Sequence, residues 1–331
     1  MSQIPGVETI KTAVRLAGRA PSLHNSQPWR WVFDGAVLQL YSVPARMLSS
    51  TDSSGRQLLL SCGIALGHLR AALAAAGWCA TVAYFPNPTR HDHLATVVFE
   101  PSPIVTEADR DRAAAIERRH TDRLPFLPPA GWPDFDIVMR TLIPRDDAVL
   151  TSLPDQARSD LARASRLTAA IRRYDHAYQA ELRWWTGHSF ATTGVPPSAL
   201  VSAAERERVD VGRTLPTVPD LSRRTAVTAD QSVVLVLSTT GDTGEELVHC
   251  GEALSTLLLE CTVAGYATCT LTHVIELPDS RAIVRRLTGL PQRPQALVRV
   301  GMIPDGDAPA WPTPRLPLGQ ILEIVTAAPG R

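Results

Sequence analysis

Lysine is nearly missing from this chain of 331 residues: Lys11 is the only one, so arginine carries the rest of the positive charge. Lysine plus arginine and aspartate plus glutamate balance at 33 each. This balance argues against a general nucleic-acid or anionic-membrane surface, although it permits a local basic pocket. Arginine offers a fixed, always-charged fork that suits phosphate, but a high-GC genome would produce the same bias, and composition alone favours that second cause.

Paired cysteines, a leader and long apolar runs are also missing. The five cysteines are odd in number and none forms a CxxC pair, which is typical of reduced thiols in a cytoplasmic protein. The N-terminal MSQIPGVETIKTAV has no basic region followed by an apolar stretch, so no signal peptide is predicted. The longest apolar stretches are interrupted by His68 and Arg70, or by Glu260, and we expect no membrane span.

The common catalytic signatures are absent as well. The sequence contains no GxGxxG after a strand, no GxxxxGK[ST], no HExxH and no GxSxG. His91 and His93 flank Asp92 in a polar loop, and two histidines without a third ligand nearby are more typical of a protein surface than of a metal site. No metal site is predicted.

What is present is a mixture of helical and strand patterns that predicts an α+β fold. Residues 124–133 are rich in proline and indicate a crossover, and periodicity fades between 186 and 230, where 201–213 is the one short helical pattern. We expect helices at 8–19, 56–76, 106–119, 156–172, 174–185, 245–264 and 279–287, and strands at 37–43, 80–85, 94–101, 233–239, 268–274 and 296–303.

The two longest helical patterns resemble each other. When Cys62 is set against Cys250, an offset of 188, both segments read CGxALxxLx₆AG followed by an aromatic residue. Small residues let a helix pack closely against a partner, and the final glycine suits a helix C-cap. Two Ala-rich helices could align by chance, but identical residues in register at both ends favour an internal duplication.

Two short segments carry candidate binding chemistry. In Ala20–Trp29 (APSLHNSQPW), two prolines fix the backbone around Ser22, Asn25 and Gln27, which could hold the polar edge of a flat heteroaromatic ring or simply cap helix ends in a rigid turn. In Arg118–Arg123 (RRHTDR), guanidiniums and a hydroxyl within one turn suit phosphate. Arginines at a solvated helix end also explain the second pattern, and the residues alone favour this second explanation over a phosphate site.

Both segments resemble signatures of the FMN-dependent nitroreductase family. Ala20 to Trp29 matches APSxxNxQPW at every defining position, and Arg119, His120, Thr121 and Arg123 match the phosphate motif R-[RH]-[ST]-x-[RK]. The stretch 296–322 is similar to the family's last strand and closing SRLP-type segment, and 250–265 with 268–273 is similar to its late helix and the strand end beside the flavin. The resemblance leaves 134–232 unmatched.

The order of the two signatures departs from the family pattern. Ordinary members are dimers with the arginine motif before the loop, and their flavin lies at the interface; here the loop comes first. The chain therefore resembles the Acg-like branch found in actinobacteria, in which a fused pseudo-dimer holds a single FMN. This resemblance implies a nitroreductase-like fold with a first half at 1–105, a second half at 106–331, and a monomer that needs no partner chain.

The resemblance also implies roles for individual residues. Arg119 and Arg315 would bind the phosphate with Thr121, Arg123 would lie near the pyrimidine edge, and backbone amides around Thr270–His273 would approach N5. Thr313 stands where many members carry a lysine, which removes one positive charge. The implied FMN-binding residues are Pro21, Ser22, Leu23, Asn25, Gln27, Arg119, His120, Thr121, Arg123, Thr270, Leu271, Thr272, His273 and Arg315.

Three functions follow from this resemblance and the sequence around it. The first is an oxidoreductase in which NAD(P)H reduces FMN and a small aromatic acceptor, a nitroaromatic or a quinone, reoxidises it; the cofactor carries this chemistry, so no acid, base or nucleophile is needed. The second is an FMN storage protein with 186–230 as a closed lid, unless that segment is a solvated insertion remote from the site. The third is a scaffold that binds no flavin.

Overall fold

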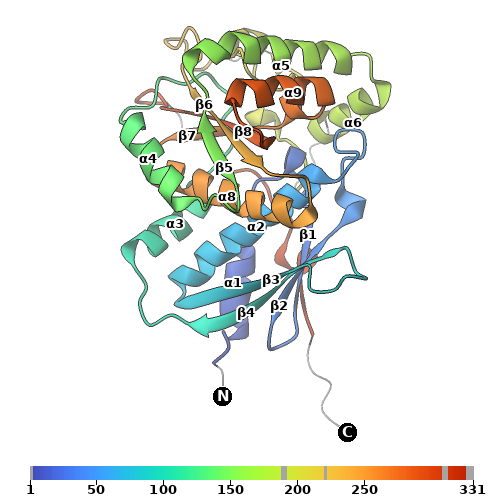
Figure 1. Cartoon of the computed structure of the whole chain (residues 1–331), viewed down its shortest axis with the longest axis vertical. Helices are drawn as coiled ribbons and strands as arrows, with labels where there is room; N and C mark the ends of the chain where they lie inside the picture. The colour runs from blue at the N-terminus through green and yellow to red at the C-terminus, as the bar shows by residue number, and fades with distance from the viewer. Residues whose placement is uncertain (1–2, 188–191, 220–221, 308–311, 326–331) are drawn as a thin grey trace.

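The protein was analysed as a computed structural model that describes residues 3–187, 192–219, 222–307 and 312–325. Two sheets, antiparallel except for one strand pair in the first, lie on either side of a pair of long helices (Figure 1). The first sheet has the order β3 (Trp78–Tyr84), β4 (His93–Pro101), β2 (Leu38–Ser42), β1 (Trp29–Phe33) and β9 (Leu322–Ile324). The second has the order β5 (Val149–Ser152), β6 (Val233–Thr239), β8 (Arg293–Gly301) and β7 (Ala267–Leu271).

The helices fill the space between the sheets and cover the outer face of the second sheet. Helices α2 (Arg56–Ala75) and α8 (Gly244–Val263) form the central pair, with α1 (Val7–Ala17) and α3 (Glu107–Arg118) packed beside them. Helices α5 (Arg158–Arg172) and α9 (Pro278–Thr288) pack on the second sheet. The remaining helices are α4 (Trp132–Leu142), α6 (His176–Gly187) and the short α7 (Ala203–Glu207). The α+β class expected from the sequence is confirmed.

The two sheets share one topology. Without β9, the strand order of the first sheet is β1-β2-β4-β3, and that of the second is β5-β6-β8-β7. In both, the strands are therefore arranged as first, second, fourth and third in chain order, and every neighbouring pair is antiparallel. In each half the long helix, α2 or α8, connects the second strand to the third. The register slips once in each half, at Leu40/Tyr41 in the first sheet and at Leu237/Ser238 in the second.

Helices α2 and α8 cross at two glycines. A Cβ added at Gly63 would overlap the carbonyl of Val248 and lie 2.9 Å from the Cα of Gly251. A Cβ added at Gly251 would overlap the carbonyl of Leu60 and lie 2.7 Å from the Cα of Gly63. Since Leu60 and Val248 are also 188 positions apart, these contacts are reciprocal, as contacts across a two-fold axis are.

Replacing Gly63 by alanine is expected to lower the free energy of unfolding by about 3 kcal/mol or more, because backbone rather than a flexible side chain fills the space. Gly187→Ala is the matched control, since nothing lies within 4 Å of its added Cβ. Thermal and denaturant unfolding would measure both variants. Equal stability of the two would show that the helices do not cross this closely.

Several elements differ from the sequence expectations. Strands β1, β5 and β9 and helix α4 were not predicted, and the short helix expected at 201–213 spans only the five residues of α7. Strand β9 is the most consequential, because it crosses to the first sheet and pairs in parallel with β1. The segment 124–133, expected to be a crossover, runs without regular structure as far as Gly131 and ends in the first residues of α4, and its Leu127 forms a bridge to Met302 beyond β8.

The segment that follows α6 is held by its own contacts. We call its described residues 192–219 and 222–230 the strap. Its Val195, Leu200 and Leu215 bury against Tyr178 and Leu182 of α6 in a small separate cluster. Arg223 binds the fully buried Glu205 with distances of 2.9 Å to both carboxylate oxygens. The strap is therefore a packed part of the fold and not a solvated insertion.

Helix α2 is long and apolar enough by composition to cross a membrane, the one such helix in the described part of the chain. In the fold, 67% of that apolar window is buried. Its length and hydrophobicity are those of a core helix packed against α8.

Candidate functional site

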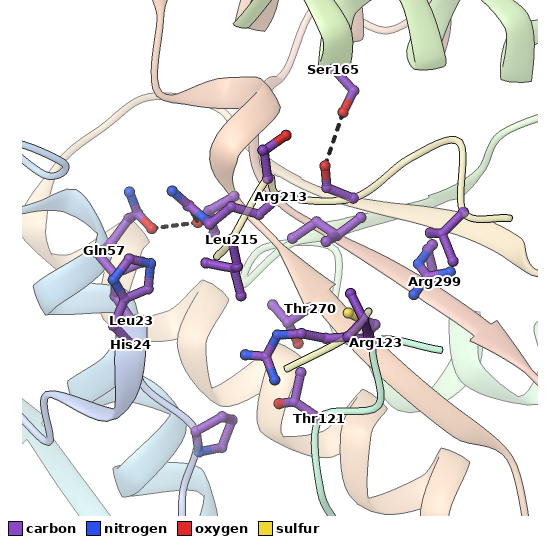
Figure 2. Close-up of a pocket in the computed structure, with 18 of the residues that line it drawn as sticks. Leu23, His24, Gln57, Thr121, Arg123, Ser165, Arg213, Leu215, Thr270 and Arg299 are labelled. Carbon is purple, nitrogen blue, oxygen red and sulfur yellow. Dashed lines mark hydrogen bonds between the residues drawn. The ribbon is translucent and has the colours of Figure 1, made fainter. Parts of the chain in front are cut away.

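A cavity of about 340 Å³ lies where the Pro21 loop, α2, β7 and the strap come together (Figure 2). Its wall is formed by the Pro21–His24 loop, the N-terminal part of α2, the segment around Thr121 and Arg123, strand β7 and the strap, with further residues from α5, α8 and β8. Its apolar lining comes from Leu23, Leu60, Ile64, Leu215, Leu254 and Leu271. Apolar walls with a few convergent polar groups are the usual setting for a flat organic ligand.

A smaller cavity of about 50 Å³ adjoins the first. The two share lining residues, namely Pro21, Ser22, His24, Thr121 and Arg123. The smaller one is closed by Asn25, Arg119, Gly194, Val195, Pro196, Ala199, Thr313 and Arg315. This cavity therefore brings the Pro21 loop together with Arg119 and Arg315. Pro21 and Arg315 are nearly 300 residues apart in the sequence.

Positive charge in the smaller cavity has no negative partner. Arg119 is buried, Arg315 is half-buried, and the Nε atoms of both lack a hydrogen-bond partner. Burial and then the neighbouring guanidiniums lower the pKa of Arg315 to about 9, while burial and Arg19 lower that of Arg119 to about 10. Within the described ranges neither forms an ion pair with a carboxylate. Two unpaired guanidiniums at the end of a cavity favour an anion there.

Arg19 is a third member of this group that sequence reasoning missed. Its backbone carbonyl accepts hydrogen bonds from Arg315 Nη2 at 2.9 Å and Arg119 Nη2 at 3.3 Å, and its own Nε is buried without a partner. Arg19 directly precedes Ala20, so its place beside the loop signature was the available signal. Arg19 adds a positive charge near Arg119 and Arg315, and Arg315 is close in sequence to Thr313, the position at which a lysine was expected from the resemblance.

Arg123 sits between the two cavities. Its Nη1 donates to the carbonyl of Ala199 at 3.3 Å, and burial lowers its pKa. Thr121, two residues earlier, forms a parallel bridge with Thr268 at the start of β7, which fixes this segment against the second sheet. The same strand carries Thr270 and Leu271 into the lining of the large cavity, and Thr272 follows directly after it.

Asn25 and Gln27 bind protein groups more than they face the cavities. Asn25 Nδ2 donates to the carbonyls of Gly194 and Pro314 at 3.2 and 3.0 Å. Gln27 Nε2 donates to the carbonyl of Thr192 at 2.7 Å, and its Oε1 accepts from the amide of Leu316 at 2.8 Å. Asn25 still borders the smaller cavity, but Gln27 lines neither. Their contacts fasten the loop to the strap and to the segment that holds Arg315.

Two further residues implied by the resemblance lie outside the lining. His120 is half-buried beside Asp122, with 3.8 Å between Nε2 and Oδ2. His273 is buried behind β7, where its Nε2 lies 2.8 Å from Ser165 Oγ. Burial, followed by Arg213 and Arg299, lowers the pKa of His273, so it is neutral. Neither side chain is placed to touch a ligand in these cavities.

The loop itself has an unusual backbone. His24, Asn25 and Gln27 have φ angles of +48°, +60° and +51°, although none is glycine. Such conformations cost free energy and cluster at ligand sites, where surrounding contacts over-determine them. Ser22 Oγ contributes one such contact, accepting from the amide of Gln27 at 2.9 Å.

Arg213 fastens the strap over the large cavity. Its guanidinium forms a buried ion pair with Glu276 and donates to Tyr178 Oη at 2.9 Å and Thr272 Oγ1 at 3.2 Å. Gln57 of α2 joins the network by donating to Glu276 at 3.3 Å and accepting from Thr272. Burial opposes the charge on Arg213, but Glu276 and Tyr178 outweigh it and raise its pKa. Sequence patterning missed Arg213, because one arginine in an aperiodic segment carries no signal.

The polar groups near these cavities do not resemble a metal centre. Among the residues that the structure describes, no three histidine, cysteine, aspartate or glutamate side chains come together. The five cysteines are free, and Cys269 of β7 lies in the cavity wall beside Arg123 and Arg299.

Comparison with known proteins places this geometry in a family. A Mycobacterium tuberculosis protein named "Putative NAD(P)H nitroreductase acg" is 49% identical over 317 residues, covering 96% of each chain. The chain belongs to the nitroreductase family. A second relative from the same organism is 50% identical over 319 residues, covering 95% of this chain and 93% of the relative, and the nitroreductase family model itself matches residues 145–302.

One solved nitroreductase gives a distant structural likeness. The FMN-dependent nitroreductase NfnB from Mycobacterium smegmatis in complex with NADPH aligns with 68% of this chain and 100% of its own, with 15% identity and a TM-score of 0.40. The family match spans β5 to β8. It excludes both the loop at Pro21 and the arginines at 119 and 315, so the assignment of these site residues rests on the cavities described above.

Proposed function

We propose that the protein is an FMN-dependent NAD(P)H oxidoreductase of the nitroreductase type. The observation that carries this is that Arg119 and Arg315 line the small cavity at one end of an apolar cavity, with no carboxylate partner among the described residues and with the charge of Arg19 close to both. A phosphate at one end and a flat apolar ring at the other are the two features that FMN combines.

The residues fit FMN at each point. The three arginines would hold the phosphate dianion, and Thr121 lies between them and the larger cavity. Pro21, Ser22 and Leu23 would line one side of the ring, and Thr270, Leu271 and Thr272 the other. Arg123 would place positive charge near the pyrimidine edge, which favours the reduced anionic flavin. Bound FMN supplies the electron transfer itself, from NAD(P)H to a nitroaromatic or quinone.

The chain supplies both halves of this site and only one copy of it. The shared topology and the reciprocal contacts of Gly63 and Gly251 support a fused pseudo-dimer with halves at 1–105 and 106–331. Ser61, Ile64 and Thr272 line the cavity, and the offset of 188 relates them to His249, Glu252 and Tyr84. Those three residues contact one another in place of a second cavity: Tyr84 Oη donates to Glu252 at 2.6 Å, and the centre of its ring lies 4.2 Å from that of His249.

We expect one FMN for each 331-residue chain and a monomer in solution. Titration of the apoprotein with FMN, followed by light scattering of the saturated complex, measures both quantities. Two flavins per chain would contradict the filled second site. Binding only by a dimer would contradict the fusion.

The strap supports a second candidate, an FMN store with little turnover. Val201, Val209, Arg213 and Leu215 of the strap line the same cavity as the flavin loop, so a nicotinamide would have to displace them. Absorption spectra before and after anaerobic NADPH separate the two functions. Rapid bleaching of the flavin supports the reductase, and a flavin that stays oxidised supports the store. The free cysteines accord with the reducing cytoplasm, the proposed location.

A further inference from the structure

His24 is the one imidazole in the lining of these cavities, within the described residues, and the proposed roles do not use it. It stands at a variable position of the loop signature, between Leu23 and Asn25, so the motif assigns it nothing. Only 7% of the residue is exposed, and both Nδ1 and Nε2 lack a hydrogen-bond partner. Two unsatisfied buried polar atoms on one side chain cost free energy unless a ligand satisfies them.

The surroundings of His24 keep its ring uncharged. Burial, then Arg213 and then Arg123, lower its pKa well below the ordinary range. A neutral imidazole has one N–H donor and one acceptor nitrogen. It can therefore serve a ligand edge that carries both a carbonyl and an N–H group, without adding to the positive charge of the arginines.

His24 lies at the boundary of the two cavities and lines both. Arg213 and Arg123, the two charged groups that lower its pKa, both line the larger cavity. Figure 2 shows His24 on the same side as Gln57, with Arg123 across the cavity. The apolar lining described above lies in this cavity too, and it is the part suited to an aromatic ring.

We infer that His24 binds the isoalloxazine ring of the flavin directly, through hydrogen bonds from an imidazole whose two nitrogens are buried and unpartnered in the cavity wall. This inference rests on the proposed function. The left-handed backbone at His24 is what turns its side chain into the wall, and Asn25 and Gln27 hold that backbone through their contacts to the strap and to the Arg315 segment.

The test compares three ligands that share the ring: FMN, riboflavin and lumiflavin, which lacks both ribityl chain and phosphate. Apoprotein titrations followed by flavin fluorescence give each dissociation constant. His24→Phe, which keeps an aromatic side chain without its nitrogens, is expected to weaken all three about tenfold. His24→Asn, which keeps one donor and one acceptor, should recover part of that loss. Arg119→Ala should weaken FMN alone.

Each outcome is decisive for His24 and separate from the wider proposal. If lumiflavin binds His24→Phe as tightly as it binds the unmodified protein, the hydrogen bonds from His24 to the flavin ring are contradicted. With ¹⁵N-labelled histidine in the unmodified protein, one buried imidazole should shift on lumiflavin addition. Absence of that shift contradicts the inference without any variant. Failure of the unmodified protein to bind FMN would contradict the proposed function instead.

Discussion

Arg315→Ala or Arg119→Ala is expected to weaken FMN binding by about 2–4 kcal/mol, roughly 30- to 1,000-fold in dissociation constant. Both arginines line the small cavity and have no carboxylate partner among the described residues, so the phosphate dianion would be their principal charged partner. Riboflavin has no phosphate and should lose far less affinity. Parallel titrations of the two flavins measure the difference, and equal losses for both would contradict the phosphate assignment.

The pH dependence provides an independent check on the same arginines. In the free protein, burial and like charge lower the pKa of Arg315 to about 9, so this group is protonated below that pH and begins to lose its proton above it. A phosphate needs the protonated form, and FMN affinity should therefore be flat from pH 7 to 8.5 and fall as the pH rises through 9 to 10. Riboflavin affinity should not follow this fall.

Glu276→Gln is expected to speed both FMN release and anaerobic flavin reduction by NADPH at least tenfold. The substitution keeps the size of the side chain but leaves Arg213 as an uncompensated buried charge, and breaking such pairs costs about 3–5 kcal/mol. The two side chains are 1% and 11% exposed, so solvent cannot replace the lost partner. The strap would open more often, and opening, not hydride transfer, would set both rates.

Arg293→Gln is the matched control for that experiment. It breaks a half-exposed ion pair with Asp242, which keeps its bidentate contact to Arg281, and Asp242 is not part of the strap. We expect it to change neither rate. Stopped-flow absorbance gives the reduction rate, and trapping of released FMN gives the other. If Glu276→Gln folds and binds FMN with both rates unchanged, the strap is not a lid. Replacing 190–220 by a short Gly-Ser linker should accelerate both steps in the same way.

Much of the fold was readable because its strongest patterns are local. The buried runs 56–76 and 245–264 and the strand 233–239 agree with the structure to within a residue at each end. Strands β1 and β9 gave no such signal, since β9 has three residues and exists only by pairing with β1 from the far end of the sequence. No window of sequence contains both partners of a contact of that kind.

The candidate site likewise contains residues that a local sequence pattern predicts and residues that it does not. Residues inside a signature, such as Pro21, Thr121 and Arg123, do line the cavities, because the signature fixes the local backbone that presents them. His24, Arg19 and Arg213 were missed for a common reason. Each matters through the charge or burial conferred by residues more than 30 positions away, and these are properties of the packed chain.

The place of β9 also bears on how the protein is made. Arg315 lies just before this strand, and Arg19 lies just after α1, so the anion site joins two segments of which one is synthesised almost 300 residues after the other. Domains generally fold from the N-terminus as they emerge. The first sheet can form early from β1 to β4, but its edge at β1 stays open until Leu322–Ile324 arrives. Flavin binding at this anion site therefore has to await Arg315, and nascent chains stalled before Arg315 should emerge without flavin.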